Sequence, residues 1–175
     1  HGVPYRRAYL LYGPPGTGKT TMIVGLASTF NRKVCILNVS ASSMTDECLM
    51  EAVLSAPRDS IIVLEDVDAI FDHHRMKVSD HTAASFSGLL NALDGVGTNH
   101  GVIFVLTTNH RERIDPALLR KGRIDKQFLL DYANNSQITA MYKSFRESTL
   151  EQARIFVDIL RTQLGSRRIT TAQLQ

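Results

Sequence analysis

The feature that most constrains this chain is the stretch Gly13–Thr20, which reads Gly-Pro-Pro-Gly-Thr-Gly-Lys-Thr. It matches the phosphate-binding pattern G-x-x-x-x-G-K-[ST] at every fixed position. An apolar run at 8–12 precedes it, and a helix-like segment at 21–27 follows it. This strand–loop–helix setting matters, because the positive end of the helix then adds to the attraction of the loop for an anion. The sequence therefore predicts a binding site for a nucleoside triphosphate.

Each part of this loop has an expected role. Glycine has no Cβ, so the backbone can curl close to a phosphate and point successive N–H groups at it. We expect Lys19 to reach the β- and γ-phosphates and the Thr20 hydroxyl to bind Mg²⁺. An ordinary Gly/Pro turn is the alternative, and the filled positions and both flanks argue against it. The expected nucleotide-binding residues are Gly13, Pro14, Pro15, Gly16, Thr17, Gly18, Lys19, Thr20 and Thr21.

Apolar runs and helical stretches alternate along the rest of the chain. Uninterrupted apolar runs are typical of parallel strands covered on both faces. The expected strands are 8–12, 33–39, 60–64, 102–106 and 127–130, and the expected helices are 18–30, 46–54, 83–94, 138–145 and 150–164, with polar loops at 72–82 and 95–101. The expected fold class is α/β, a P-loop NTPase three-layer sandwich with a five-stranded parallel sheet, followed by a partial helical lid.

Composition sets the remaining limits. The chain has 175 residues, of which 43% are hydrophobic, enough for one domain with a core and a small appendage. A net charge of +3 is too mild to indicate a nucleic-acid partner. No apolar run approaches the roughly 18 residues of a membrane span. Cys35 and Cys48 are expected to be buried free thiols, since Cys35 lies within an apolar strand-like run and Cys48 within a helix-like one.

Acidic residues follow the third expected strand, as Glu65, Asp66 and Asp68. At the carboxyl end of a parallel strand they face the crevice where ligands bind. One carboxylate can hold the water shell of Mg²⁺, and the next can polarise the water that attacks the γ-phosphate. A solvated acidic turn is the alternative, and the phosphate loop earlier in the chain argues against it.

Two further groups of polar residues follow the fourth expected strand. Asn109 carries both a donor and an acceptor, so it can hydrogen-bond the γ-phosphate and the attacking water together. Arg120 and Arg123 lie three residues apart around Gly122, and arginines are good phosphate ligands. They suit the nucleotide of a neighbouring subunit better than their own, as arginine fingers supplied in trans.

The chain resembles the AAA family of ring-forming ATPases over residues 5–131. The resemblance lies in four motifs that occur in the family's order, at 13–20, 64–68, 107–110 and 115–125. Within that family the chain most resembles the chaperones of the mitochondrial inner membrane that translocate the Rieske iron–sulfur protein during respiratory complex III assembly. That likeness lies in the strings at 2–7, 35–40, 86–95 and 107–110, which are more specific than the phosphate loop.

The resemblance implies a Mg²⁺-dependent ATPase that forms a homo-oligomeric ring and couples ATP turnover to the translocation or assembly of a protein substrate. By similarity, Gly16, Gly18, Lys19 and Thr20 bind phosphates and Mg²⁺, Asn109 is the sensor, and Arg120 and Arg123 are the finger arginines. Residues 1–131 would form the nucleotide-binding core and 132–175 a truncated lid. The membrane tether of the full-length protein would lie outside this fragment, which itself reads as soluble.

The chain departs from the general AAA pattern at two places. The family at large ends its third strand Asp-Glu, whereas this chain has Glu65-Asp66. We assign Glu65 to the metal and Asp66 to the general base, with Asp68 as the alternative base because the Asp66 side chain is one methylene shorter than Glu. Threading members carry an aromatic residue and a glycine in the loop before the helix that follows strand two, and 40–49 contains neither. Two alternatives stay open: a nucleotide-gated assembly scaffold with little turnover, and a different AAA chaperone or unfoldase.

Overall fold

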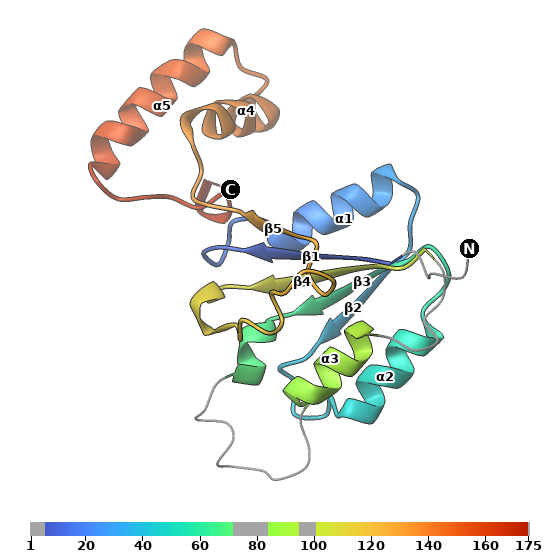
Figure 1. Ribbon diagram of the computed structural model, residues 1–175. Helices are drawn as coiled ribbons and strands as arrows, with labels where there is room; N and C mark the ends of the chain where they lie inside the picture. Colours follow the sequence, from blue (N-terminus) through green and yellow to red (C-terminus); the bar gives the residue numbers. More distant parts are fainter. Residues whose placement is uncertain (1–5, 72–83, 95–100, 175) are drawn as a thin grey trace. The chain divides into compact units, whose positions relative to one another are not determined.

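The computed structural model describes residues 6–71, 84–94 and 101–174 (Figure 1). The expected loop at 72–82 and nearly all of the one at 95–101 lie outside these ranges. The chain divides into two compact units, one made of the residues up to Gly13 with Lys19–Leu129, the other of Pro14–Gly18 with Leu130–Gln175. Most of the phosphate loop thus groups with the C-terminal helices.

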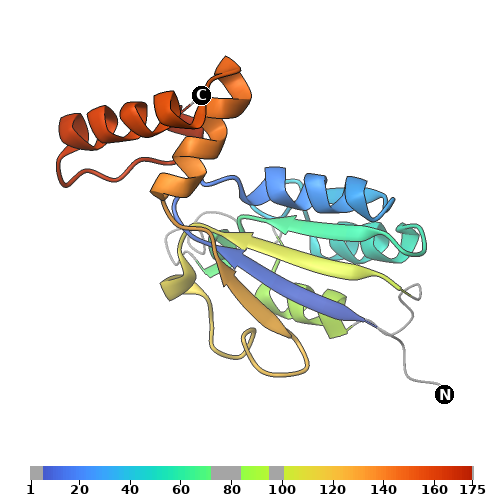
Figure 2. The ribbon, with the colours of Figure 1, turned by 90° about the horizontal axis from the view of Figure 1, so that it is seen from above.

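The first unit is built on a five-stranded sheet in the order β2-β3-β4-β1-β5, with every neighbouring pair parallel. Figure 2 shows the arrows of β4, β1 and β5 side by side and pointing the same way. All five predicted strands are confirmed. Their bounds are β1 Arg7–Tyr12, β2 Val34–Asn38, β3 Ile61–Glu65, β4 Ile103–Thr108 and β5 Lys126–Leu129.

Helices cover both faces of this sheet. Helices α2 (Asp46–Ser55) and α3 (Phe86–Asp94) pack against each other on one face, and α1 (Lys19–Thr29) lies on the other (Figure 1). Thr45 caps α2, because its hydroxyl accepts a hydrogen bond from the amide of Cys48. Short 3-10 turns, η1 (Val67–Phe71) and η3 (Arg111–Arg113), follow β3 and β4 and were not predicted. The three-layer α/β fold is confirmed.

The largest buried cluster lies between the sheet and α2 and α3. Phe104 from β4, Leu64 from β3 and Leu10 from β1 are fully buried there against Leu49 and Leu89 of the two helices. Burial of such a side chain contributes about 1.5–3 kcal/mol. The buried strands therefore fix where their carboxyl ends lie. The expectation for the cysteines was wrong in part, since Cys48 is exposed on α2 and Cys35 is half-buried.

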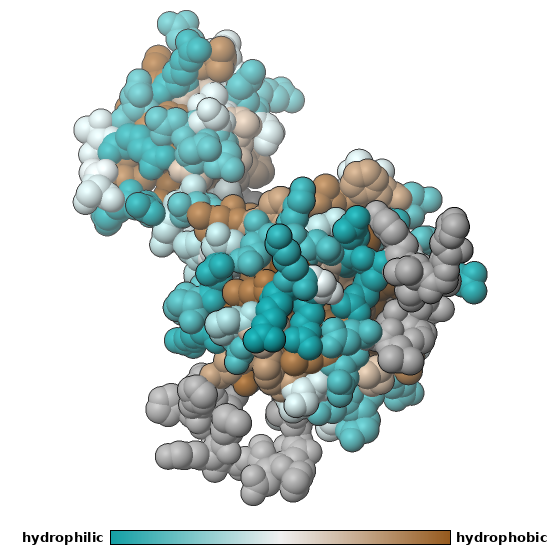
Figure 3. All heavy atoms as spheres, viewed as in Figure 1, coloured by the Kyte–Doolittle hydropathy of each residue, from teal (hydrophilic) through white to brown (hydrophobic). Residues whose placement is uncertain are grey.

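Helix α1 is apolar on more than the side that faces the sheet. Ile23 and Ala27 are buried, while Met22, Val24 and Leu26 are each more than 40% exposed. Figure 3 shows apolar spheres along the part of the surface where α1 lies in Figure 1. A helix that is apolar all round is typical of one with neighbours on several sides. None of the helices within the described ranges has the length and hydropathy needed to cross a membrane.

The second unit is helical. Helices α4 (Asn135–Arg146) and α5 (Leu150–Leu164) each begin with a reciprocal capping box, and a short 3-10 turn, η4 (Ala172–Leu174), follows. The cap at Asn134 explains why α4 begins three residues earlier than its apolar periodicity predicted. Tyr142 stacks on Phe156 with ring centroids 4.3 Å apart, and a small apolar core of Ala133, Ile138, Val157 and Ile169 holds the unit together.

Candidate functional site

The carboxyl ends of β1, β3 and β4 meet at one edge of the sheet. The three strands are neighbours, with Leu10 paired with Leu106 and Leu64 with Leu106. Just beyond the strands, the amide of Gly13 donates to the carbonyl of Thr108 at 3.3 Å. The polar residues that follow each strand are therefore brought together at this edge, as the parallel topology predicts.

Lys19 connects the first strand to the fourth. Its ammonium donates to Gly13 O at 2.8 Å and to Asn109 Oδ1 at 2.7 Å. Burial lowers the pKa of Lys19, while the nearby Asp66 and Asp68 act in the opposite direction. Lys19 and the predicted sensor Asn109 are thus hydrogen-bonded to each other, close enough for both to contact the same phosphate.

Thr20 connects the first helix to the third strand. Its hydroxyl donates to Glu65 Oε1 at 2.6 Å. A hydroxyl and a carboxylate are hard oxygen donors of the kind Mg²⁺ prefers, and this metal binds through one or two protein oxygens with waters and phosphates completing its shell. The pair therefore fits the metal site that the sequence predicts.

Asp66 is exposed and holds an uncommon backbone conformation. Its φ is +53°, in the left-handed region that non-glycine residues seldom adopt. Its amide donates to Thr107 Oγ1 at 3.4 Å, which helps to keep the residue in this turn. Partial burial of the Asp66 side chain raises its pKa, and the negative charges of Asp68 and Glu65 raise it further, against the opposing effect of Lys19. Such strain and such a pKa are common in residues that act in catalysis.

Asp68 has a different environment from Asp66. It is 9% exposed, and its Oδ1 accepts a hydrogen bond of 2.6 Å from Thr108 Oγ1. The same threonine oxygen accepts from the amide of His110 at 2.9 Å. Asp68 therefore fixes the turn after β4 that carries Asn109. The roles of Thr107 and Thr108 were missed by sequence reasoning, although their position beside Asn109 was a signal.

The loop 14–18 is hydrogen-bonded to the segment that follows α5, within the second unit. Gly16 O accepts hydrogen bonds from Thr171 Oγ1 and from the amide of Ala172, both at 3.0 Å. Gly16 has a φ of +76°, and a Cβ there would meet Thr170 Oγ1 at 3.1 Å and Ala172 Cβ at 3.2 Å. Within the loop, Thr17 Oγ1 donates to Pro14 O at 2.9 Å. Glycine is thus favoured at position 16 by the close approach of Thr170 and Ala172, as well as by its backbone conformation.

The other predicted nucleotide-binding positions lie in the same stretch. Pro15 is exposed in the loop, Gly18 has a φ of +88°, and Thr21 is exposed in the first turn of α1. No hydrogen bond of the Pro15 or Thr21 side chain singles these residues out among the described residues.

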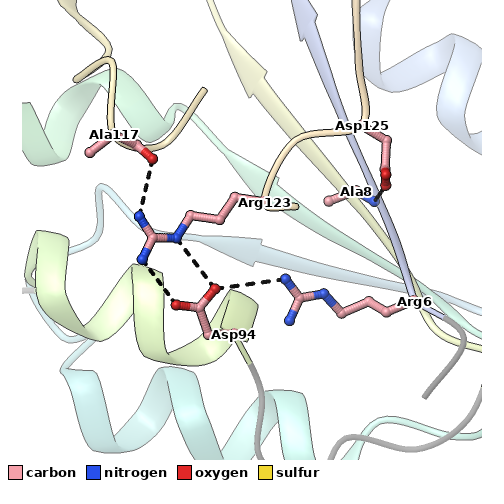
Figure 4. A network of polar contacts seen from close by, with 6 residues as sticks. All are labelled: Arg6, Ala8, Asp94, Ala117, Arg123 and Asp125. Atoms are coloured by element: carbon pink, nitrogen blue, oxygen red, sulfur yellow. Dashed lines mark hydrogen bonds and ion pairs between the residues drawn. The ribbon is translucent and has the colours of Figure 1, made fainter. Parts of the chain in front are cut away.

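The two predicted finger arginines differ in the contacts that their side chains make. Arg120 is exposed and makes no hydrogen bond or ion pair through its side chain within 6–71, 84–94 and 101–174. Arg123 donates from Nε and Nη2 to the two carboxylate oxygens of Asp94, at 3.3 and 3.1 Å, and from Nη1 to Ala117 O at 3.1 Å (Figure 4). Sequence reasoning treated the two residues alike and did not identify Asp94.

Comparison with known proteins agrees with this geometry. The family described as "ATPase family associated with various cellular activities (AAA)" matches residues 9–132. The mitochondrial chaperone BCS1 of Homo sapiens is 43% identical over 82% of this chain, and the probable mitochondrial chaperone bcs1 of Schizosaccharomyces pombe is 42% identical over 91%. The probable mitochondrial chaperone BCS1-B of Dictyostelium discoideum is 36% identical over 99%. The chain spans 36%, 36% and 43% of the lengths of these three relatives.

Proposed function

Because this chain belongs to the AAA family of ATPases, we propose that it hydrolyses ATP in a Mg²⁺-dependent reaction, as a subunit of a homo-oligomeric ring. The observation that carries this proposal is the meeting of Lys19, Asn109, Thr20 and Glu65 through two short hydrogen bonds at one edge of the sheet. Thr20 and Glu65 supply oxygens of the kind that Mg²⁺ prefers, and Asn109 supplies the donor and acceptor that can orient a water beside the γ-phosphate.

The phosphates would be held by the loop that begins at Gly13 and by Lys19. Backbone N–H groups of the loop and the N-terminus of α1 favour a negative charge. The Lys19 ammonium would exchange its bond to Asn109 for one to the γ-phosphate, because a charged oxygen is the stronger acceptor. Asn109 would then be free to orient the attacking water.

Thr20 and Glu65 would hold Mg²⁺, directly or through its waters. When bound, the ion neutralises charge on the β- and γ-phosphate oxygens. Thr20 supplies a neutral oxygen and Glu65 a charged one, already within hydrogen-bond distance of each other. Removing either side chain would weaken the binding of Mg²⁺ more than the binding of the nucleotide.

Asp66 would act as the general base. Asp66 is an exposed residue whose side chain makes no hydrogen bond among the described residues, whereas Asp68 is buried and already accepts a hydrogen bond from Thr108. A base with a raised pKa accepts the proton of the attacking water more readily than an ordinary aspartate does. These observations support Asp66 rather than Asp68 for this step, and Asp68 would instead fix the turn of Asn109.

Arg120 would contact the γ-phosphate of the ATP bound to a neighbouring subunit. An arginine finger of this kind is worth about 10³–10⁵ in rate, which corresponds to about 4–7 kcal/mol. Arg120 is exposed and its side chain makes no hydrogen bond or ion pair within residues 6–71, 84–94 and 101–174, which suits this role because none of the described contacts would be lost when it binds in trans.

For the whole protein we propose a chaperone role in the mitochondrial inner membrane. The proposal is supported by the relatives named as mitochondrial chaperones and by the resemblance to the translocase of the Rieske iron–sulfur protein. The protein substrate would be that iron–sulfur protein, in complex III assembly, and the membrane tether would lie outside residues 1–175.

The test is phosphate release by the full-length protein, with and without Mg²⁺, for the wild type and for three variants. Asp66→Asn should bind ATP and barely hydrolyse it, Glu65→Gln should require more Mg²⁺, and Asp68→Asn should lose less turnover than Asp66→Asn. No Mg²⁺-dependent release from assembled rings would instead support a nucleotide-gated scaffold. Normal turnover by Asp66→Asn together with loss by Asp68→Asn would move the base to Asp68.

The trans role of Arg120 has its own test. Rings that mix Arg120→Ala subunits with Lys19→Ala subunits contain interfaces where an intact nucleotide site meets an intact arginine. Such rings should recover part of the turnover that each variant lacks by itself. No recovery in rings shown by mass to be mixed would rule out action in trans.

A further inference from the structure

The segment that carries Arg120 is held rigidly at both ends. Leu118 and Ile124 are buried, and Gly122 allows the tight turn between them with a φ of +97°. The amides of Arg123 and Ile124 both donate to the carbonyl of Arg120, at 3.1 and 3.3 Å. The main chain at Arg120 therefore has little freedom, although its side chain is exposed.

The side chain of Arg123 closes the same turn. Its guanidinium takes both oxygens of Asp94 in a forked arrangement and also donates to Ala117 O, on the other limb of the segment. A forked pair of this type combines charge with fixed geometry. To reach a phosphate, Arg123 would have to give up three hydrogen bonds, whereas Arg120 would give up none among the described residues.

Asp94 is the last residue of α3 and is shared by a second cation. Figure 4 shows Arg6 and Arg123 approaching its carboxylate from opposite sides, and the Arg6–Asp94 distance is 4.0 Å. The guanidinium of Arg6 also lies 5.7 Å from the centre of the Phe104 ring in the buried core. The carboxylate thus links the finger segment to α3 and, through Arg6, to the start of β1.

From this network we infer that the two arginines have different roles, an inference that rests on the ring ATPase proposed above. Arg120 alone touches the neighbour's nucleotide. Arg123 is a positioning residue: held by Asp94, it keeps the turn in the geometry that aims Arg120 outward. Asp94 is then a positioning residue too, one that sequence reasoning did not identify.

The two roles predict different behaviour for Asp94. If Arg123 bound phosphate itself, freeing it from Asp94 would leave turnover unchanged or raise it. If Arg123 positions Arg120 through Asp94, then Asp94→Asn and Arg123→Ala should share one defect. Misplacing a reacting group by about 1 Å can cost on the order of 100-fold in rate, so we expect each variant to lose roughly 10- to 100-fold in kcat.

The experiment uses full-length rings carrying Asp94→Asn, Arg123→Ala, Arg123→Lys, Arg120→Ala or the double variant Asp94→Asn/Arg123→Ala. Arg168→Ala, which removes an exposed arginine 3.9 Å from Asp131, is the control. Ring mass and thermal midpoint are measured for all variants. We expect kcat to fall while KM for ATP stays within about twofold, because each subunit's own pocket is intact. The double variant should be no slower than either single variant, as expected for residues that act as one unit.

A structural defect alone would not give this pattern. Mixing Asp94→Asn subunits with Lys19→Ala subunits should restore turnover at interfaces that receive an intact finger segment, because the Asp94→Asn site itself is sound. Arg123→Lys keeps the charge but not the fork, so it should fall between the wild type and Arg123→Ala. This variant and Asp94→Asn decide the matter if Arg123→Ala fails to assemble.

Wild-type kcat in Asp94→Asn rings would overturn the inference and leave the proposed function standing. A double variant whose loss in kcat equals the product of the two single losses would also overturn the inference. Wild-type turnover in Arg120→Ala rings would overturn the proposed finger itself, and the inference with it.

Discussion

We expect ATP binding to depend more on Lys19 than on any other side chain. Its ammonium already lies between two oxygen acceptors of its own subunit, and hydrogen bonds that involve a charged group contribute about 1.5–3 kcal/mol each. We expect Lys19→Ala to weaken ATP binding by at least about 100-fold, measured by calorimetry or nucleotide displacement. Lys33→Ala, at an exposed lysine just before β2, is the charge-matched control and should bind normally. Equal affinity in both variants would contradict the assignment of the phosphate loop.

Asp66 links stability to pH. Its pKa is raised in the folded protein, so folding favours the protonated carboxyl. This stabilisation is complete below the unfolded pKa, near the ordinary value of 3.8, and is lost as the pH rises through the higher folded pKa. At neutral pH the ionised Asp66 therefore destabilises the fold.

We accordingly expect Asp66→Asn to raise the thermal midpoint near pH 7, in protein without nucleotide or Mg²⁺, while it removes turnover. The difference from the wild type should shrink as the pH falls toward 4. Asp158→Asn, at an exposed position of α5, provides the comparison at each pH. A lower midpoint for Asp66→Asn at pH 7 would contradict the raised pKa.

The residues of the site divide into those that local sequence could identify and those that it could not. Gly16, Lys19 and Glu65 stand in patterns whose spacing reflects their chemistry. The pairs Asp68–Thr108 and Asp94–Arg123 join residues 40 and 29 positions apart. Only the folded chain brings such partners together: Asp68 and Arg123 stand out in the sequence, but nothing there pairs them with Thr108 and Asp94. The left-handed φ of Asp66 likewise depends on its neighbours, because an isolated aspartate disfavours it.

At the scale of elements, the strands could be predicted because buried parallel strands are apolar without interruption. The helix bounds were less certain, since caps rather than periodicity decide them. Neither principle predicts that 14–18 packs with the C-terminal unit, because the contact between Gly16 and Thr171 spans 155 positions. The short 3-10 turns after β3 and β4 were missed for a related reason, as tertiary packing rather than local propensity forms them.

Helix α1 offers a prediction of its own. Gly25 lies in its interior, and no heavy atom lies within 4 Å of the place where a Cβ would be added. Alanine is better than glycine in a helix interior by about 0.5–1 kcal/mol. We expect Gly25→Ala to raise the free energy of unfolding by about this amount.

The matched variant is Gly16→Ala, where a positive φ and the close approach of Thr170 and Ala172 should make the same change destabilising. Denaturant unfolding of the two variants, compared by their midpoints at constant slope, distinguishes these effects. A fall in stability for Gly25→Ala would show that α1 has a neighbour at this position.

At the scale of the whole molecule, the segment before α2 bears on how a substrate would be handled. Ser40 bonds to Asn38 through both its amide and its hydroxyl, Met44 packs on the core, and Thr45 caps the helix. Small side chains that are hydrogen-bonded within their own segment bury little apolar area, and each Å² of buried apolar surface contributes only about 25 cal/mol. Such a segment is poorly suited to grip an unfolded chain under load.

We therefore expect the full-length protein to move its substrate folded, by a change in the shape of the ring. An iron–sulfur protein crosslinked internally, so that it cannot unfold, should be translocated as well as the uncrosslinked form in an import assay with isolated mitochondria. A reversible crosslink, tested again after it is cut, controls for damage to the substrate. Transport of the uncrosslinked form alone would point to threading without an aromatic grip.

The carbonyl of Gly16 has a consequence for the speed of nucleotide capture. A carbonyl oxygen has two lone pairs, and here both have a donor, from Thr171 and from Ala172. The orientation of this peptide is thus set before ATP arrives, and no slow rearrangement of the loop need precede or follow the encounter. In stopped-flow traces, the observed rate should rise linearly with ATP concentration without a plateau, and should slow with added salt as screening weakens the attraction for a polyanion.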